Sequence, residues 1–305
     1  MKKTFSVIFL AALAGCSSFK NAKKTDDSFV IASYNVRCPC DKGDNQWRLR
    51  IPRIASVIEK YGFDIFGVQE AVRHVADVLQ AELPHYRRIG CGRAPMCDGE
   101  SNYIFYDGNR FECIDYGTFW LSGTPLVSGS RYEGAGCPRT CTWGRFKDLR
   151  TGKTFTYYNT HLDHVSSRAR LDGAKVLAAN GLRASLERGE TVFLTGDMNE
   201  TLAPRKEDSP ESLKKYAPDE LKALAEKNPI AFFSTLLNDT YAVSETPHAG
   251  THETYTGYRD PPRVRIDYVY ATGNVKVLSH VTVNDRIDGK FPSDHDPVAA
   301  TVEIR

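Results

Sequence analysis

Short apolar runs that each end in an acidic, amide or imidazole side chain recur along this chain and constrain its fold. Residues 29–34 (FVIASY) read as a strand, and Asn35 follows directly. Glu70 follows the run DIFGV, His161 follows FTYYNT, and Asp197 follows VFLTG. Side chains at strand ends are held by rigid elements, on which a site can be built. The pattern therefore predicts a strand-rich fold whose strand ends carry the functional groups.

Helical patterns alternate with these runs, and no linker or low-complexity segment interrupts them after residue 28. We expect helices at residues 51–61, 168–187 and 209–226, with Pro52 tolerated in the first helical turn. We expect strands at residues 29–34, 64–68, 101–106, 154–159, 191–194, 265–270, 275–283 and 298–304. This mixture predicts an α+β fold with packed sheets and outer helices. A chain of 305 residues with 41% apolar side chains can bury one large core, so residues 28–305 are interpreted as a single domain.

The N-terminus has the features of a bacterial export signal. Lys2 and Lys3 precede an apolar stretch, residues 5–13, that is too short to span a bilayer. The stretch ends in LAGC, which resembles a lipobox, so residues 1–15 are predicted to be a lipoprotein signal peptide and Cys16 the lipidated residue. Ser17 is typical of outer-membrane sorting in Gram-negative bacteria. Residues 16–27 would then form a polar tether to the cell envelope.

Charge and cysteine content narrow the function classes. Without Lys2 and Lys3, the 40 basic side chains fall to 38, which equals the 38 acidic ones. Proteins that grip long nucleic acid usually carry a basic excess, so any such contact here would be local. Export permits disulfides among the other seven cysteines. The pairs Cys91/Cys97 and Cys137/Cys141 are interpreted as disulfides that close loops rather than as zinc ligands, although sequence does not determine the connectivity.

The residue types at the strand ends indicate a metal-assisted reaction. Carboxylate and amide oxygens are hard ligands that suit Mg²⁺ or Mn²⁺ better than zinc. The sequence therefore predicts one or two such ions, in a number that it does not determine.

Six motifs occur in the same order as in the endonuclease/exonuclease/phosphatase superfamily, which residues 29–305 resemble. They are SYNVR, GVQE, NTHLDH, GDMNE, IDY and SDHDP. The superfamily includes pancreatic-type DNases, apurinic endonucleases, neutral sphingomyelinases, inositol polyphosphate phosphatases and deadenylases. The strings FWLSGTP and PRTCTW are similar to those of a bacterial branch. The resemblance implies a four-layer α/β/β/α sandwich, with two packed mixed β-sheets flanked by helices and the active site at one rim.

The resemblance also implies which residues hold the metal and the water. Glu70 would be the principal metal ligand, with Asn35 beside it and Asp294 close to the ion. Asp197 and Asn199 are alternate residues of an extended segment, so both side chains can face one site. The superfamily uses such a pair to orient the attacking water and to hold the scissile phosphate.

Two histidines complete the implied catalytic set. His295 would act as base or transition-state stabiliser, with Asp267 fixing its tautomer. His161 would donate to a phosphate oxygen or assist the leaving group. Arg37 and Arg139 are candidate phosphate contacts, because a guanidinium fork suits tetrahedral oxygens.

Three neighbouring positions leave their roles open. Asp163 and His164 fit packing or supporting roles as well as catalytic ones. Thr256 stands where relatives usually carry a histidine, which puts substrate contacts in that loop in doubt.

The chain is thus expected to be an exported, lipid-anchored and metal-dependent hydrolase of phosphodiester or phosphomonoester bonds that acts by in-line attack of water. It would be either nuclease-like or directed to phospholipids or small phosphodiesters. Extracellular nucleic acid, phospholipid head groups and small phosphodiesters or phosphate esters remain open as substrates, and a monomer is expected. The alternative class is a non-catalytic surface binding protein that retains the fold. Residues 204–227 either line the cleft or form a solvated helix.

Overall fold

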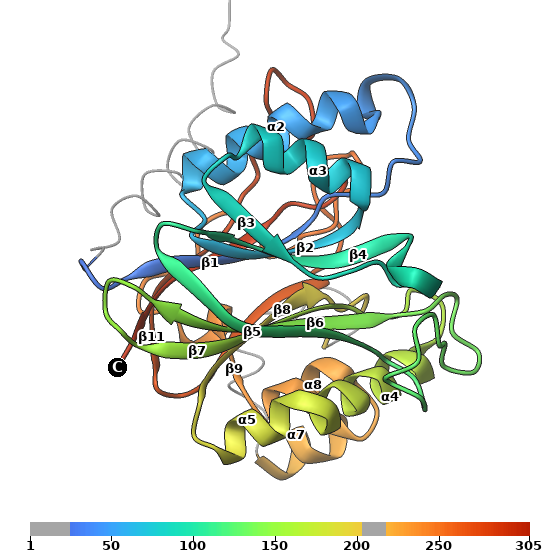
Figure 1. The fold of residues 1–305 in the computed structure, drawn as a ribbon, viewed down its shortest axis with the longest axis vertical. Helices are drawn as coiled ribbons and strands as arrows, with labels where there is room; N and C mark the ends of the chain where they lie inside the picture. The colour runs from blue at the N-terminus through green and yellow to red at the C-terminus, as the bar shows by residue number, and fades with distance from the viewer. Residues whose placement is uncertain (1–24, 203–217) are drawn as a thin grey trace, which may run out of the picture.

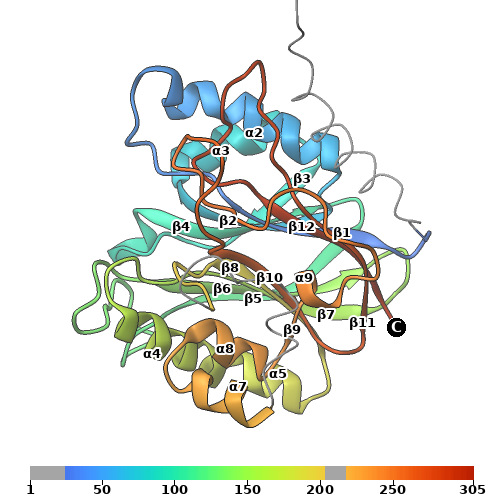
Figure 2. The ribbon, with the colours of Figure 1, turned by 180° about the vertical axis from the view of Figure 1, so that it is seen from behind.

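Two six-stranded sheets pack face to face between two layers of helices, as the views from both sides show (Figures 1 and 2). The computed structural model describes residues 25–202 and 218–305. The predicted four-layer sandwich is confirmed. Within these two ranges, no helix is long and apolar enough to cross a membrane.

The first sheet joins the two ends of the described chain. Its strands run in the order β11 (Val275–Thr282), β12 (Val298–Ile304), β1 (Phe29–Asn35), β2 (Ile65–Val72), β4 (Glu100–Asp107) and β3 (Tyr86–Ile89). Strands β1 and β2 are parallel, whereas β12 runs antiparallel to β1. Helices α2 (Trp47–Tyr61) and α3 (Arg73–Glu82) cover the outer face of this sheet (Figure 1).

The second sheet carries the other layer of helices. Its order is β5 (Phe111–Trp120), β6 (Thr140–Asp148), β7 (Thr154–His161), β8 (Thr191–Asp197), β10 (Asp267–Ala271) and β9 (Asn238–Asp239). Its outer face is covered by α4 (Ser167–Leu177), α5 (Arg183–Glu187), α7 (Pro218–Ala225) and α8 (Pro229–Ser234) (Figure 1). The short helix α9 (Thr240–Val243) follows β9.

Strict alternation along the strands separates the inner core from the two outer cores. On β1, Phe29 and Ile31 join the cluster between the sheets, whereas Val30 and Ala32 pack with α2 and α3. Because successive side chains of a strand point to opposite faces, each strand contributes to two cores. The same alternation determines which side chains at the strand ends reach the rim between the sheets.

Three helical expectations change in detail. Helix α2 begins at Trp47, because Leu49 and Arg50 already donate their N–H groups to Gln46 O, so Pro52 lies in the second turn. The helix expected at 168–187 is α4 and α5 joined by a π-helical turn at Ala178–Leu182. Of the segment 209–226, residues up to 217 lie outside the described residues, and α7 accounts for most of the rest.

Candidate active site

Three polar side chains of the second sheet stand side by side at one rim. Asp197 is the register partner of His161 on the parallel strand β7 and of Asp267 on the antiparallel strand β10. Asp197 points to the same face of the sheet as Phe193 of its own strand, and Asp267 points to the same face as Val269. These polar groups therefore continue the face that, further along the strands, forms the apolar core between the sheets.

The first sheet adds an amide and a carboxylate to the same rim. Asn35 is the last residue of β1, points to the same face of the sheet as Ile31 and is fully buried. Alternation alone would send Glu70 to the helix side with Val68. However, the register of β2 against β4 shifts between Val68 and Ala71, and Glu70 has a φ of 66°. A β-bulge of this kind re-aims a side chain, which brings Glu70 to the site.

The Asn35 amide joins the two carboxylates. Its Nδ2 donates to Glu70 Oε1 and to Asp197 Oδ2, both at 2.9 Å. Its Oδ1 accepts the N–H of Arg37 at 2.9 Å, which fixes the orientation of the amide. The remaining oxygen of Glu70, Oε2, accepts the N–H of Cys38 at 2.8 Å. Although burial acts to raise it, these contacts and the charges of His295 and Arg37 lower the pKa of Glu70.

A buried arginine holds the loop that supplies these amides. The guanidinium of Arg50, from α2, donates to Val36 O, to Arg37 O at 3.1 Å and to Cys38 O at 2.9 Å. Arg50 is 1% exposed, so its charge is neutralised mainly by backbone carbonyl dipoles. Helix α2 thereby positions the Cys38 amide against Glu70.

A histidine–carboxylate pair lies on the other side of Asp197. His295 Nδ1 is 2.8 Å from Asp267 Oδ2, and His295 Nε2 is 3.7 Å from Asp197 Oδ2. Thr254 Oγ1 also donates to Asp267 Oδ2, at 2.6 Å. Burial acts to lower the pKa of His295, but the charges of Asp267 and Asp197 outweigh it and raise that pKa well above its ordinary value. The imidazole is therefore held with a proton on Nδ1.

Asp197 is the most perturbed carboxylate of the cluster. Burial and the negative charge of Asp267 raise its pKa to about 7, against the lowering effect of His295. Its Oδ1 accepts the N–H of Asn199 at 2.9 Å. Asn199, at a φ of 48°, leaves the strand with its amide directed back to the rim.

His161 is present as a neutral acceptor. Asn199 Nδ2 donates to His161 Nε2 at 2.9 Å and to Leu162 O at 3.1 Å. Burial and the charge of Arg139 lower the pKa of His161 well below its ordinary value. A neutral imidazole that accepts at Nε2 carries its proton on Nδ1. Donation from Nε2 to a phosphate would require His161 to exchange this hydrogen bond.

Arg37 and Asp294 border the carboxylate side of the rim. Arg37 lies 3.2 Å from Asp41, 3.6 Å from Asp294 and 3.8 Å from Glu70. Burial raises the pKa of Asp294 above its ordinary value, and the Glu70 charge adds to this effect. Arg37 is thus surrounded by acidic groups in this structure, and its contact with a substrate phosphate stays a prediction.

Arg139 directly precedes β6 and lies near His161. It is 6% exposed; its Nη2 is 2.9 Å from His164 Nδ1, and its Nε is 3.8 Å from Asp163 Oδ2. Its Nε and Nη1 have no hydrogen-bond partner among the described residues. Burial lowers the pKa of Arg139. A buried guanidinium with unused donors is suited to an anion, and its contact with a substrate phosphate stays a prediction.

The donor set at the rim fits a divalent cation. Ligand atoms of Glu70, His161 and Asp197 lie within 4.8 Å of one another, as do those of Asp197, Asp267 and His295. Asp267 Oδ1 is buried without a hydrogen-bond partner in the part of the chain that the structure describes. Unpaired buried carboxylate oxygens are costly unless a cation or a proton satisfies them. Glu70 and Asp197 supply the hard oxygens that Mg²⁺ and Mn²⁺ prefer, whereas the Asn35 oxygen accepts the Arg37 N–H.

A buried polar layer beneath the site was not predicted. Gln69 Nε2 donates to Ser33 Oγ at 3.1 Å and to Asn159 Oδ1 at 2.7 Å, and Thr195 Oγ1 donates to the same Asn159 oxygen at 3.2 Å. Ser33, Asn159 and Thr195 each stand two positions before a residue of the site, and Gln69 stands one position before Glu70. A β carbon on Gly67 would overlap Asn159 and Thr195. Polar residues at inward-facing strand positions were the sequence signal from which this layer could have been predicted.

The loop after Thr254 closes the His295 side. The Tyr255 ring lies 5.1 Å from the His295 ring, edge to face. Thr256 Oγ1 donates to Asp294 O at 2.9 Å, and Tyr258 OH donates to Asp41 Oδ2 at 2.8 Å. Thr256 therefore supports the backbone of the SDHDP turn.

The cysteine expectation was wrong in its pairings. The disulfide joins Cys38 to Cys40, and Cys91, Cys97, Cys137 and Cys141 are free thiols. Cys141 is fully buried on β6, on the face that packs against the second helix layer, so it is not a loop residue. Cys91 and Cys97 do lie in contact, and burial together with Cys97 raises the pKa of Cys91 to about 12.

Comparisons with known proteins concern the family and the fold. The sequence model of the endonuclease/exonuclease/phosphatase family matches residues 32–295. A Bacteroides vulgatus protein of this family is similar, with 29% identity, a TM-score of 0.76, and coverage of 92% of this chain and 100% of that one. The Bacteroides thetaiotaomicron mannosyl-6-phosphatase Bt3783 has 29% identity, a TM-score of 0.75, and coverage of 90% and 99%.

More distant similarity concerns the fold alone. The D. rerio TDP2 structure with a single-strand DNA product has 15% identity, a TM-score of 0.64, and coverage of 91% of this chain and 100% of that one. A comparison with curated protein sequences gives no significant match.

Proposed function

The chain belongs to the endonuclease/exonuclease/phosphatase family, and on that premise we propose that it hydrolyses phosphate esters by metal-assisted attack of water on phosphorus. The observation that carries the proposal is the contact of Asn35 with both Glu70 and Asp197 beside the His295–Asp267 pair. It brings acidic groups from both sheets to one point, together with an oriented imidazole. Such a set can hold a cation, a phosphate and a water at once.

Each residue receives a role from its position. Glu70 and Asp197 would hold an Mg²⁺ or Mn²⁺ ion, which when bound neutralises charge on the phosphate oxygens. Asp197 and His295 face the same space and would orient the water, and Asp197, with a pKa of about 7, would accept its proton. Asp267 keeps the Nδ1 proton on His295 and thereby directs Nε2 to the reaction.

The phosphate would lie over the other flank of Asp197. Asn199 and His161 contact each other there, and their shared hydrogen bond can be exchanged for bonds to phosphate oxygens. Arg139, with two unused donors, would neutralise the phosphate from beyond His161. Arg37 would take part only after releasing one of its acidic partners.

We propose a small phosphomonoester, such as a sugar phosphate, as the substrate. The relative Bt3783, 29% identical over nearly the full length of both chains, is named a mannosyl-6-phosphatase. The balance of 38 basic and 38 acidic side chains in the chain without Lys2 and Lys3 gives no general attraction for a polyanion. TDP2, whose structure holds a single-strand DNA product, resembles this chain in fold alone and so gives DNA less support as the substrate.

A substrate panel with two matched variants tests the proposal. Hexose 6-phosphates, other phosphomonoesters, phosphodiesters, DNA and sphingomyelin are assayed with Mg²⁺, with Mn²⁺ and after chelation, beside Asp197→Asn and His295→Ala. We expect turnover of monoesters that chelation abolishes and that falls by about 10³-fold or more in both variants. Equal inertness of wild type and variants would instead favour a non-catalytic binding protein. Turnover confined to diesters would overturn the substrate but not the chemistry.

We also propose that the chain is a lipoprotein of the cell envelope, anchored through Cys16, which lies outside the described residues. The support is the sequence of residues 1–16. Labelled palmitate should enter the wild type and not Cys16→Ser, and only the wild type should fractionate with membranes. Equal membrane association of both proteins would refute the anchor.

A further inference from the structure

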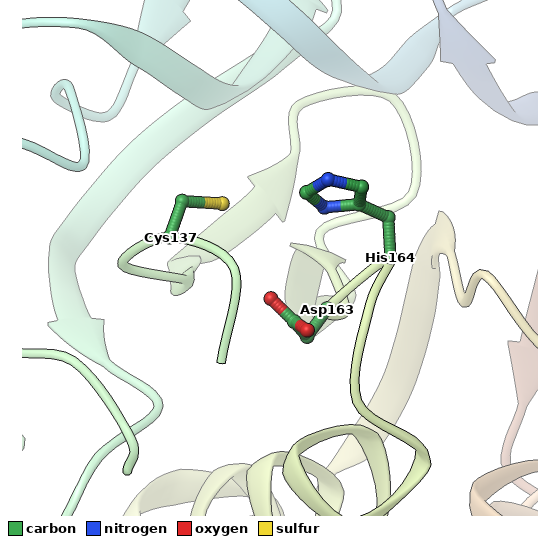
Figure 3. A group of neighbouring side chains, drawn as sticks. All are labelled: Cys137, Asp163 and His164. Atoms are coloured by element: carbon green, nitrogen blue, oxygen red, sulfur yellow. The ribbon is translucent and has the colours of Figure 1, made fainter. Parts of the chain in front are cut away.

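A second cluster of metal-ligating side chains lies on two loops at the edge of the active site. Cys137 precedes β6, and Asp163 and His164 follow β7 (Figure 3). One ligand atom from each, a thiol sulfur, a carboxylate oxygen and a ring nitrogen, lies within 4.8 Å of the others. None of the three belongs to the set around Glu70 and Asp197 described above.

The carboxylate of this cluster is oriented in advance. Asp163 is 2% exposed and accepts backbone N–H groups of Gly136 at 2.9 Å, Val165 at 3.0 Å and Ser166 at 2.8 Å. These bonds tie the Cys137 loop to the turn after β7. They fix the separation of thiol and imidazole without using every acceptor position of the carboxylate.

Acceptor groups of the cluster already face a cation. Arginine can only donate, so the bond from Arg139 Nη2 leaves His164 Nδ1 with its lone pair directed at the guanidinium. Asp163 Oδ2 faces the same side chain at 3.8 Å. Because Nε and Nη1 of Arg139 have no hydrogen-bond partner within residues 25–202 and 218–305, only the Nη2 atom of this buried guanidinium is hydrogen-bonded in this place.

We propose that Cys137, Asp163 and His164 form a regulatory site for a thiophilic divalent cation such as Zn²⁺, which takes the place of the Arg139 guanidinium. Thiolate and imidazole favour Zn²⁺ over Mg²⁺, so the site discriminates against the catalytic ion. Three protein ligands leave a fourth position for water. Binding releases the thiol proton of Cys137 to solvent, and the metal–sulfur bond replaces the S–H bond.

Occupation of this site removes Arg139 from its position beside His161. Zn²⁺ would therefore weaken substrate binding at a site that contains no zinc itself. This consequence rests on the proposed function, in which Arg139 contacts the phosphate. Metal binding at the three residues does not rest on it.

Cobalt as a spectroscopic probe tests the binding alone. Co²⁺ is titrated into the full chain in excess Mg²⁺, and the thiolate-to-cobalt charge-transfer absorption is recorded. The Glu70–Asp197 site has no free thiol among its described neighbours, since Cys38 is in a disulfide, so it cannot give this signal. We expect the wild type to bind one equivalent of Co²⁺ with this band and Cys137→Ser to lose the band. Binding should be at least tenfold weaker in His164→Ala and unchanged in the control Cys113→Ser, which replaces a half-buried cysteine. Absence of the band in a wild type with a titratable Cys137 thiol, or its persistence in Cys137→Ser, overturns the site.

Enzyme kinetics test the consequence. We expect Zn²⁺ to raise KM at least tenfold in the wild type and in Cys113→Ser, and to leave Cys137→Ser unaffected. A cobalt band without inhibition would retain the metal site and reject the link through Arg139. An enzyme inactive on every substrate would reject the proposed function and leave the cobalt result standing.

Discussion

Asn35 at the end of β1 donates a 2.9 Å hydrogen bond to Asp197 at the end of β8, across the junction of the two sheets. The same nitrogen donates to Glu70, so one amide spaces two carboxylates that would otherwise repel each other. The site therefore depends on how the two sheets pack as much as on the residues at the strand ends.

Replacing Asn35 by alanine should reduce both metal affinity and turnover. The change leaves Glu70 and Asp197 without their shared donor, and supporting contacts of this kind contribute about 10- to 100-fold. We expect a weaker apparent Kd for Mg²⁺ and a fall of that size in kcat/KM. Metal titrations of activity measure both. Asn228→Ala removes the N-cap of α8 and serves as the control, because it should change stability and leave the metal titration as in the wild type.

Asp267 and His295 should behave as a single unit. Asp267→Asn withdraws the charge that holds the Nδ1 proton, and loss of such an orienting carboxylate costs on the order of 10⁴-fold in kcat. In Asp267→Asn/His295→Ala, we expect kcat/KM no lower than in His295→Ala alone. Additive losses in the double variant would show that Asp267 acts independently, for example as a metal ligand.

The elements that could be predicted from sequence are those with a strong local signal. Strands ending in Asn35, His161 and Asp197 combine an apolar run with a polar terminus. All three were predicted, and they extend one, two and three residues beyond the expected ends at 34, 159 and 194. Strands β5 and β6 were missed: positions 112–118 of β5 are exposed or half-buried, and β6 alternates between buried and exposed positions only in its second half. Their pairing is a long-range choice that local propensity does not encode.

The position of Glu70 shows why the geometry of the site could not be predicted from the sequence pattern alone. Alternation places Glu70 on the helix side, and only the bulge at a φ of 66° turns it to the rim. The disulfide was misjudged for a related reason: Cys141 lies in a strand, where packing decides its neighbours. Tertiary contacts decided both outcomes.

Gly67→Ala should destabilise the protein and impair the site together. The new methyl group would overlap Asn159 and Thr195 in the polar layer between the sheets, and overpacking of this type costs about 1–3 kcal/mol. Urea denaturation should show that loss, with a lower kcat/KM in the folded protein. Gly123→Ala is the control, because no described atom outside its chain neighbours lies within 4 Å of its added methyl. Equal stability of the two variants would contradict the role assigned to Gly67.

A partly buried histidine cluster remote from the proposed chemistry should make stability depend on pH. His248 Nδ1 lies 3.0 Å from His280 Nδ1, and His248 Nε2 donates to Thr251 O at 2.8 Å. Burial lowers the pKa of His248 to about 4, with Arg265 adding to the effect, and burial also lowers the pKa of His252 to about 4.

The sign of the effect follows from proton linkage. Below about pH 6.5 the unfolded chain binds protons at these histidines, whereas the folded chain does not until about pH 4. Their contribution to stability is therefore complete above pH 6.5 and is lost as the pH falls toward 4. At roughly 1.4 kcal/mol per pKa unit, a shift from 6.5 to about 4 corresponds to a loss on the order of 3 kcal/mol from His248. His248→Gln keeps a donor for Thr251 but does not titrate, so its unfolding free energy should fall less steeply between pH 6.5 and 4. The exposed His85→Gln should follow the wild-type curve, and identical curves for all three proteins would show that His248 titrates alike in the folded and unfolded states.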